Sequence, residues 1–514
     1  MEFIEQIPRW VLELGFVIYA VTVSVVVLLE RRRPTATLAL VLSMLFLPVV
    51  GLLTYAFFSQ RKVRRKRKNR RRRVIDPVAG TESMATLDAL PEGLSVQQRG
   101  LVRLALHATA APLRRASDVR LLVTADDARE AVLAAIATAT RCVHAEFYIW
   151  RDDESGRAIT AALARRAREG IQVRVLVDQL GSWGLEREHF GELLKAGGEV
   201  SIFGPVRVPI RLGRSRVNFR NHRKILTIDG STGFVGGLNV GDKYFGSGSE
   251  ADGWRDLFVQ LQGDAVLGLE ATFLDDWLVT TGQVVDLEGK RPAGTQSLDA
   301  RELVGQHAPT PALEQANPFN GTAERPIRSD GPLTQVIPSG PDLPVTGAIA
   351  AQFSAAIAAA HERAYIATPY FVPDEPLMLI LRTAALRGVD VRILVPSPDK
   401  NDSRLVAYAS RSYYDELLQV GCRIFEYDAG MLHAKYLIAD DVCAIGSANM
   451  DVRSFHINYE ITAMFYDAKV TADLASVYEA DLGDATEVHR HDRTEPSIWA
   501  RLRENSARVL SPLL

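Results

Sequence analysis

Two short stretches of this chain carry histidine and lysine at one spacing, and the same glycine and asparagine pattern follows each. The first stretch contributes His222, Lys224, Asp229, Gly236, Gly237 and Asn239, and the second His433, Lys435, Asp440, Gly446, Ser447 and Asn449. Both read HxKxxxxD and then G[GS]xN. An ordered pattern of this length that occurs twice is far more specific than a lone histidine, which is more often an ordinary core residue.

The spacing indicates what these side chains can do together. On a strand, residues two apart point to the same face, so each HxK pair presents an imidazole beside an ammonium. A small residue at Gly237 or Ser447 would let a phosphate oxygen approach the backbone, and the Asn239 and Asn449 amides can donate to it. If the two stretches face each other, they surround one point with two imidazoles and two ammonium groups. We interpret this as a phosphate site.

Asp229 and Asp440 allow two readings. They can be counted with His222 and His433 in the catalytic set, or they can be carboxylates that stabilise a turn, and the turn reading is favoured because Asp229-Gly230 is a good hairpin pair. Six residues separate Asp229 from Gly236 but only five separate Asp440 from Gly446. The second hairpin is therefore predicted to be one residue tighter.

The elements that must position these residues alternate between strand and helix. Residues 142–150 and 171–177 read as strands, and residues 157–169 read as the amphipathic helix between them. The pattern returns later in the chain: 170–178 resembles 388–396, 146–154 resembles 368–376, and 200–203 resembles 422–425, at offsets of 218, 222 and 222. We predict an α/β protein with two similar lobes about a pseudo-twofold axis.

The first sixty residues differ from the rest. Residues 10–29 and 35–58 are apolar runs long enough to cross a bilayer, and the run 61–73 holds eleven basic side chains and no acid. These features predict two transmembrane helices with residue 61 onward in the cytoplasm. The predicted division is a transmembrane hairpin at 1–60, a basic juxtamembrane linker at 61–115, a first lobe at 116–287, a linker at 288–345 and a second lobe at 346–514.

Charge and cysteine content exclude several classes of protein. The formal charge is −2, and without the basic run the remaining chain carries −13, which argues against a nucleic-acid partner. Three cysteines cannot form a disulfide framework, and no HExxH or other metal-binding pattern is present, so neither a metal nor a cofactor is expected. Six arginines precede the first motif, and they can bind an anionic lipid or form a solvated loop: Arg207, Arg211, Arg214, Arg216, Arg220 and Arg223.

The paired motifs resemble the phospholipase D superfamily, and two apolar runs before two such lobes resemble the bacterial cardiolipin synthases within it. The stretches EFYIWRDDESG, NFRNHRKILTIDG, ATPYFVPDE and SANMDVRSFHINYEI carry the likeness. The resemblance implies that one of His222 and His433 is the nucleophile, with His222 favoured, and that the other is the general acid. It also implies that Asp256 and Glu460, located 34 and 27 positions after the two histidines, orient the imidazoles.

The implied activity is phosphatidyl transfer between two phosphatidylglycerol molecules, which yields cardiolipin and glycerol in a bacterial inner membrane. Anionic phospholipid is then the partner, and the sequence does not indicate an oligomeric state. Three alternatives stay open: a membrane-tethered hydrolase of the same fold, a nucleic-acid phosphodiesterase and a catalytically inactive membrane scaffold. Aromatic stacking positions along a basic channel would be the signature of the second.

Overall fold

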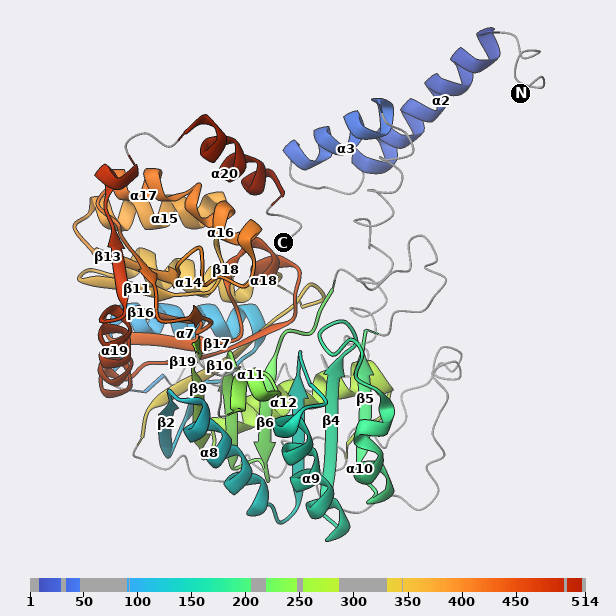
Figure 1. Ribbon diagram of the computed structural model, residues 1–514, viewed down its shortest axis with the longest axis vertical. Helices are drawn as coiled ribbons and strands as arrows, with labels where there is room; N and C mark the ends of the chain where they lie inside the picture. Colours follow the sequence, from blue (N-terminus) through green and yellow to red (C-terminus); the bar gives the residue numbers. More distant parts are fainter. Residues whose placement is uncertain are drawn as a thin grey trace. The chain divides into compact units, whose positions relative to one another are not determined.

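The computed structural model describes residues 9–28, 34–46, 90–91, 93–204, 219–246, 253–285, 331–343, 345–493 and 497–510 (Figure 1). The chain divides into two compact units. Helices α2 and α3 belong to the first, and the elements from α7 onward belong to the second. The residues of both histidine motifs lie in the second unit.

Helices α2 (Arg9–Leu28) and α3 (Pro34–Phe46) pack against each other through Val27, Leu40 and Met44. The Tyr19 hydroxyl donates to the Met44 carbonyl oxygen at 3.1 Å. Among the helices that the structure describes, none combines the length and apolar character needed to cross a membrane. The second predicted span continues through 47–58, and those residues lie outside the described ranges, as does the basic run 61–73.

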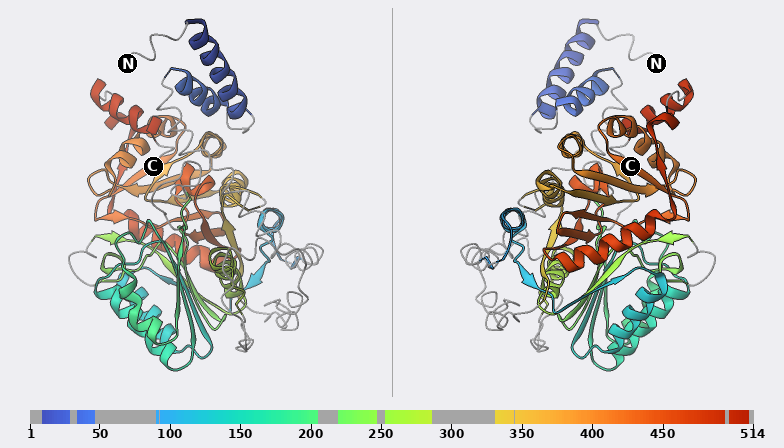
Figure 2. Two further views of the ribbon diagram at one scale, coloured as in Figure 1. Left: turned by 90° about the vertical axis from the view of Figure 1, so that its right-hand side faces the viewer. Right: turned by 90° about the vertical axis from the view of Figure 1, so that its left-hand side faces the viewer.

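A seven-stranded mixed sheet forms the first lobe, in the order β2-β9-β7-β6-β3-β4-β5. Its strands are β2 (Asp118–Leu122), β3 (Cys142–Phe147), β4 (Gln172–Asp178), β5 (Glu199–Phe203), β6 (Lys224–Ile228), β7 (Thr232–Gly236) and β9 (Phe258–Gln262). Its helices are α8 (Ala125–Ala137), α9 (Glu154–Arg168), α10 (Gly191–Lys195), α11 (Asp242–Phe245) and α12 (Val266–Thr281). Helices α8 and α9 lie along one face of this sheet (Figure 2).

A nine-stranded sheet forms the second lobe, in the order β1-β10-β19-β17-β16-β11-β13-β14-β20. Its strands are β1 (Arg114–Arg115), β10 (Leu333–Ser339), β11 (Arg363–Ala367), β13 (Asp390–Pro396), β14 (Arg423–Tyr427), β16 (Tyr436–Ala439), β17 (Val442–Gly446), β19 (Glu460–Phe465) and β20 (Ala485–Val488). Its helices are α7 (Val96–Thr109), α14 (Ala348–Ala359), α15 (Glu375–Leu386), α16 (Arg404–Arg411), α17 (Tyr414–Gln419), α18 (Val452–His456), α19 (Ala468–Leu482) and α20 (Ile498–Leu510).

The two sheets share one topology. Strands β10-β19-β17-β16-β11-β13-β14 repeat the order of the first sheet, with the same parallel and antiparallel pairings. The repeated segments 170–178 and 388–396 become β4 and β13, which occupy equivalent places. The prediction of an α/β protein with two similar lobes is therefore confirmed.

Two predicted linkers contain parts of the second lobe. Strand β10 falls inside 288–345, and it pairs with β19 in the sheet interior. Helix α7 and strand β1 fall inside 61–115, yet β1 pairs with β10, and the Gln335 amide donates to the carbonyl oxygens of Val102 and Ala111. The composition of 288–345, rich in Pro, Gly and Ser, indicated a loop although β10 lies within it, so the predicted linker bounds do not coincide with the ends of the sheet.

Local signals in the sequence fix where the helices begin. The Asp153 carboxylate accepts from the Gly156 backbone N–H at the start of α9, and Asp374 does the same for Leu377 at the start of α15. An apolar core runs through both lobes, with Ile225 and Leu269 from the first and Ile445 and Ile461 from the second. The lobes are thus one packed body, which fixes the position of each motif relative to the other.

Candidate active site

His222 precedes β6 and is held by the backbone of the second lobe. The Tyr459 N–H donates to the Arg220 carbonyl oxygen at 2.8 Å, and the His222 N–H donates to the Tyr459 carbonyl oxygen at 2.9 Å. The segment 220–222 is therefore paired with the residue that precedes β19. The first histidine is positioned by both lobes.

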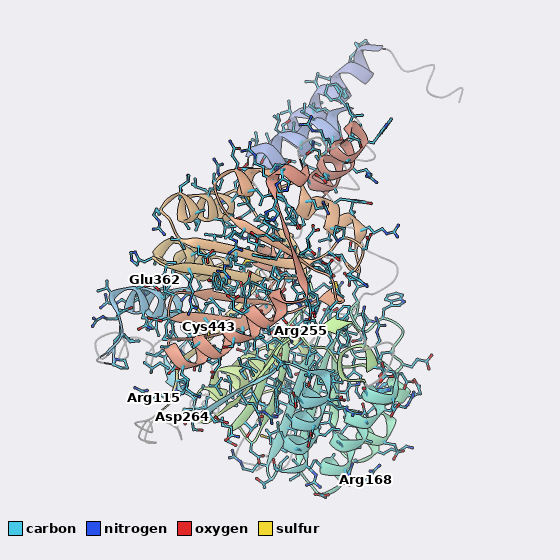
Figure 3. The ribbon with its side chains drawn as sticks, turned by 60° about the vertical axis from the view of Figure 1, so that its left-hand side comes forward. Arg115, Arg168, Arg255, Asp264, Glu362 and Cys443 are labelled. Atoms are coloured by element: carbon cyan, nitrogen blue, oxygen red, sulfur yellow. The ribbon has the colours of Figure 1, made fainter. Side chains whose placement is uncertain are left out.

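His433 is held by the reciprocal arrangement. Strand β15 (Met431–Leu432) pairs in parallel with β8 (Trp254–Arg255) of the first lobe, and the His433 N–H donates to the Arg255 carbonyl oxygen at 2.6 Å. Figure 3 shows Arg255 at the junction of the two lobes. Each histidine thus follows a short segment that is paired with the opposite lobe, as a pseudo-twofold arrangement requires.

The carboxylates cross between the lobes. His222 Nδ1 lies 3.1 Å from Glu460 Oε2, and His433 Nδ1 lies 2.6 Å from Asp256 Oδ2. The sequence identified both carboxylates, but it counted Asp256 from His222 and Glu460 from His433. The structure pairs each with the other histidine, because Asp256 follows β8 and Glu460 begins β19. Both pairings favour the tautomer with the proton on Nδ1, which leaves Nε2 available for chemistry.

Lys224 and Lys435 lie two residues after the histidines, as the motif predicts. Lys224 Nζ donates to the His222 carbonyl oxygen at 2.7 Å, and Lys435 Nζ donates to that of His433 and lies 2.8 Å from His433 Nδ1. Burial lowers the pKa of Lys224 to about 7, against the attraction of Glu460. Burial likewise lowers the pKa of Lys435 to about 8. Charging either lysine is therefore unfavourable in this buried position unless a negative charge lies close to it.

The two imidazoles share one electrostatic environment. Burial lowers the pKa of His222 despite the neighbouring Glu460, and burial together with Lys435 lowers the pKa of His433 to about 3. Lys435 contributes to the lower pKa of His222, and Lys224 contributes to that of His433, so each ammonium acts on the histidine of the other lobe. Both shifts favour the neutral imidazole at neutral pH. The His–Lys pairs of the two motifs therefore lie close to each other.

Burial raises the pKa values of Asp256 and Glu460, but nearby positive charges lower them by more. Burial raises the pKa of Asp256, yet Lys435 and His433 hold it below its ordinary value. For Glu460 the same opposition holds, with His222 and Lys224 lowering the pKa. Both carboxylates are consequently ionised beside neutral imidazoles. Each can stabilise an imidazolium when its histidine takes up a proton.

Asn239 and Asn449 are both buried, at 1% and 4% exposed. The Asn239 Oδ1 accepts from the Ile149 N–H at 3.1 Å, which turns the amide nitrogen away from that contact. The Asn449 Oδ1 has no hydrogen-bond partner in the described part of the chain. The tighter second hairpin is confirmed: three residues join β6 to β7 and two join β16 to β17, and Asn449 still occupies the place equivalent to Asn239.

Gly237 and Ser447 lie against the two carboxylates that pair with the histidines. A Cβ atom at Gly237 would lie 2.0 Å from Asp256 Oδ1, so the missing side chain makes room for that carboxylate. Ser447 Oγ donates to Glu460 Oε2 at 2.5 Å. Their backbone N–H groups donate to the carbonyl oxygens of Leu257 and Ile461. Both residues therefore support the carboxylates, and their predicted contact with substrate stays a prediction.

Asp229 and Asp440 stabilise turns at the far ends of the motif strands. Both adopt positive φ, 53° and 49°. The Asp229 carboxylate accepts from the backbone N–H groups of Thr140, Arg141 and Cys142 at 2.7–2.9 Å. Asp440 accepts in the same way from residues 361–363. These contacts support the favoured reading of both aspartates as turn carboxylates, and a catalytic part for them stays a prediction.

Two aromatic rings lie beside the histidines, and the sequence analysis selected neither of them. The Tyr148 ring centroid lies 4.9 Å from that of His222, and Lys224 Nζ lies 5.4 Å from the Tyr148 centroid. The Trp254 ring lies 4.8 Å from His433. The recurrence of Tyr148 as Tyr370, at the same offset of 222 as the repeat, is the signal that could have found the first of them.

The arginines nearest the first motif are structural. Arg220 is 2% exposed and pairs with Asp178 at 3.2 Å. Arg223 is fully buried, pairs with Asp276 and donates from Nε to the Glu460 carbonyl oxygen at 3.1 Å. Neither reading of the arginine cluster holds for these two, because they are neither solvated nor open to a headgroup. The other four arginines lie outside the described residues.

One group of possible metal ligands occurs among the described residues, beside the end of β6 that is far from His222. It comprises Cys142, His144 and Glu270, all buried. His144 Nδ1 already lies 2.7 Å from Glu270 Oε1, and burial raises the pKa of the Cys142 thiol to about 12. A metal there would have to displace an existing ion pair and deprotonate a resistant thiol.

A family model and two relatives indicate one family. A family model described as "Cardiolipin synthase, PLD-like domain" matches residues 132–270 and 353–482. Cardiolipin synthase 2 of Bacillus cereus is 37% identical over 97% of this chain and 91% of its own. A cardiolipin synthase of Halalkalibacterium halodurans is 35% identical over 98% and 95%. The fold is similar to that of a phosphatidylserine synthase from Haemophilus influenzae, with a TM-score of 0.59 and 16% identity over 81% of this chain and 100% of the other.

Proposed function

The chain belongs to the cardiolipin synthase family of phospholipase D-like proteins, and on that premise we propose that it joins two phosphatidylglycerol molecules into cardiolipin and releases glycerol. The observation that carries this proposal is the convergence of two His–Lys pairs from two lobes. Each histidine is paired with a carboxylate of the opposite lobe. Together these groups supply the nucleophile, the general acid and the positive charge that transfer of a phosphoryl group between two alcohols requires.

The first half of the reaction breaks the bond between phosphorus and the glycerol headgroup. The neutral His222 attacks phosphorus through Nε2, and His433, protonated when the anionic substrate binds, gives its proton to the departing glycerol oxygen. Lys224 and Lys435 neutralise the phosphate oxygens, and the Asn239 and Asn449 amides contact them. The products of this step are glycerol and a phosphatidyl group on His222.

The second half reverses the roles. The terminal hydroxyl of a second phosphatidylglycerol attacks phosphorus, His433 takes the proton of that hydroxyl, and the bond from phosphorus to His222 breaks. Asp256 stabilises His433 while it is protonated, and Glu460 holds His222 in the attacking orientation. Cardiolipin leaves, and the site returns to its starting protonation state. No net proton is consumed.

We infer a membrane location from the substrate and from the N-terminal sequence. Both substrates and the product are lipids, and residues 10–29 and 35–58 are apolar runs followed by eleven basic side chains at 61–73. The positive-inside rule places the catalytic lobes in the cytoplasm of a bacterium, next to the inner membrane. The basic run adds an attraction to anionic headgroups of about 1 kcal/mol per residue near the surface.

The test is to supply the purified full-length protein with labelled phosphatidylglycerol in detergent and to identify the products. We expect cardiolipin and glycerol in equal amounts, with or without EDTA, and loss of both in His222→Ala and His433→Ala. His361→Ala, which removes an exposed imidazole, is the matched control. Phosphatidic acid as the main product would identify a hydrolase instead, and loss of synthesis with EDTA would contradict a mechanism that uses only side chains.

A further inference from the structure

Helix α20 (Ile498–Leu510) closes the described part of the chain and rests on the second lobe by one face. Ala507 on that face is buried at 1% exposed. The Arg508 guanidinium lies 4.3 Å from the Tyr413 ring centroid, and Glu504 lies 3.9 Å from Arg411. The helix is therefore docked, and its orientation on the lobe is defined.

The opposite face of α20 is apolar and uncovered. Ile498, Trp499, Leu502 and Val509 are 69%, 73%, 51% and 77% exposed. Ile498, Leu502 and Val509 are four and seven residues apart, so they form one stripe along the helix, with Trp499 at its border. A contiguous apolar stripe of this kind, exposed on a docked helix, indicates a binding surface.

The flanks of this stripe are basic. Arg501, Arg503 and Arg508 are all exposed, whereas the single acidic residue of the helix, Glu504, is turned toward Arg411. Arg503 also lies 5.2 Å from the Tyr408 ring, so its stem follows the helix border. Arginines beside a stripe that contains tryptophan are typical of a helix in the headgroup layer of an anionic bilayer.

We propose that α20 is an interfacial helix that inserts Ile498, Trp499, Leu502 and Val509 into the headgroup region of an anionic bilayer. A second protein fits less well, because four side chains on a helix about 20 Å long offer less area than the roughly 800 Å² that each partner buries in a stable interface. The flanking charge also matches anionic phospholipid. This contact fixes the second lobe at the bilayer independently of the N-terminal segment.

The test places a fluorescent probe on the helix within the full-length protein. Leu502→Cys is labelled with an environment-sensitive dye, and the three native cysteines, Cys142, Cys422 and Cys443, are buried and so protected from it. The protein is reconstituted in nanodiscs that contain phosphatidylglycerol or only phosphatidylcholine, with spin-labelled lipids as quenchers. Ser476→Cys, an exposed position on α19, is the matched control.

We expect quenching at residue 502 at least three times that at 476 in anionic nanodiscs, and weaker quenching in zwitterionic ones. Quenching at 502 no greater than at 476 would overturn the proposal. So would a probe shift that increases with protein concentration in the absence of lipid quenching, because it would identify a second copy as the partner. The readout needs no turnover and is expected unchanged in His433→Ala, so it fails or succeeds separately from the proposed function.

Discussion

Lys224 and Lys435 are ammonium groups held where burial disfavours their charge. Their pKa values of about 7 and about 8 lie well below the ordinary value of 10.5. Between each of these lowered pKa values and 10.5, the unfolded chain binds more protons than the folded chain. The free energy of unfolding therefore increases with pH over this range, and that increase is lost as the pH falls through about 8 and about 7. A bound phosphate needs the charged forms and acts in the opposite direction.

We therefore predict opposite pH trends for the stability of the empty protein and for anion binding. From about pH 7 to about pH 8.5 the melting temperature of the unliganded protein should increase, while the further increase caused by inorganic phosphate should shrink. Thermal unfolding in detergent, with and without phosphate, measures both. Lys435→Met should weaken both trends. An unliganded melting temperature that falls over this range in wild type but not in the variant would contradict the assignment.

Gly237 shows how one missing side chain supports a histidine of the other lobe. A Cβ atom there would meet Asp256 Oδ1 at 2.0 Å, and Asp256 orients His433. We predict that Gly237→Ala lowers kcat by about 100-fold, because a displacement of about 1 Å at a catalytic group has an effect of this size. Cardiolipin formation under saturating lipid measures it.

The matched control is Gly191→Ala, because a Cβ atom at Gly191 meets nothing within 4 Å. That variant should retain wild-type activity. Comparable melting temperatures for the two variants would show that the lost activity is local. Full activity in Gly237→Ala would mean that the Asp256 contact with His433 does not matter for the reaction.

The short segments that carry the histidines explain which parts of the site could be predicted. The HxK spacing predicted that His222 and Lys224 act together, because residues two apart on a strand share a face whatever the surroundings. The exchange of Asp256 and Glu460 between lobes could not be predicted. It depends on the pairing of β15 with β8 and of residue 221 with residue 459, which are contacts between distant parts of the chain.

The same limit applies to the elements outside the motifs. The strong alternation of apolar residues and the repeat predicted β4 and β13, and the capping aspartates mark where α9 and α15 begin. Strand β10 and helix α7 were assigned to linkers, because their place in the second lobe comes from pairing with β19 and from packing on the sheet. Local composition carries no signal of such long-range contacts.

The whole catalytic unit is a duplicated sheet whose two copies complete each other. Seven strands recur in the same order, and each copy supplies the histidine that the other copy's carboxylate orients. One lobe alone therefore holds a histidine without the carboxylate that orients it. Because both lobes share one apolar core, the complete site forms within a single chain.

From this we predict that two inactive full-length variants do not rescue each other. When His222→Ala and His433→Ala are co-reconstituted in one membrane, cardiolipin formation should stay at the level of either variant alone. The measurement is product formation in mixed proteoliposomes, with wild type diluted to the same lipid ratio as the reference. Recovery of about a quarter or more of that reference would show that chains exchange lobes, contrary to the intramolecular site.

The division of labour between the two histidines is tested most directly with a phosphatidyl ester of p-nitrophenol, whose leaving group needs no proton. We predict that His433→Ala releases one equivalent of p-nitrophenol in a rapid burst and keeps the phosphatidyl group on His222, where peptide mapping locates it. His222→Ala should show neither burst nor attached lipid. A burst from both variants, or an attached phosphatidyl group on any residue other than these two, would contradict two imidazoles acting on one phosphorus.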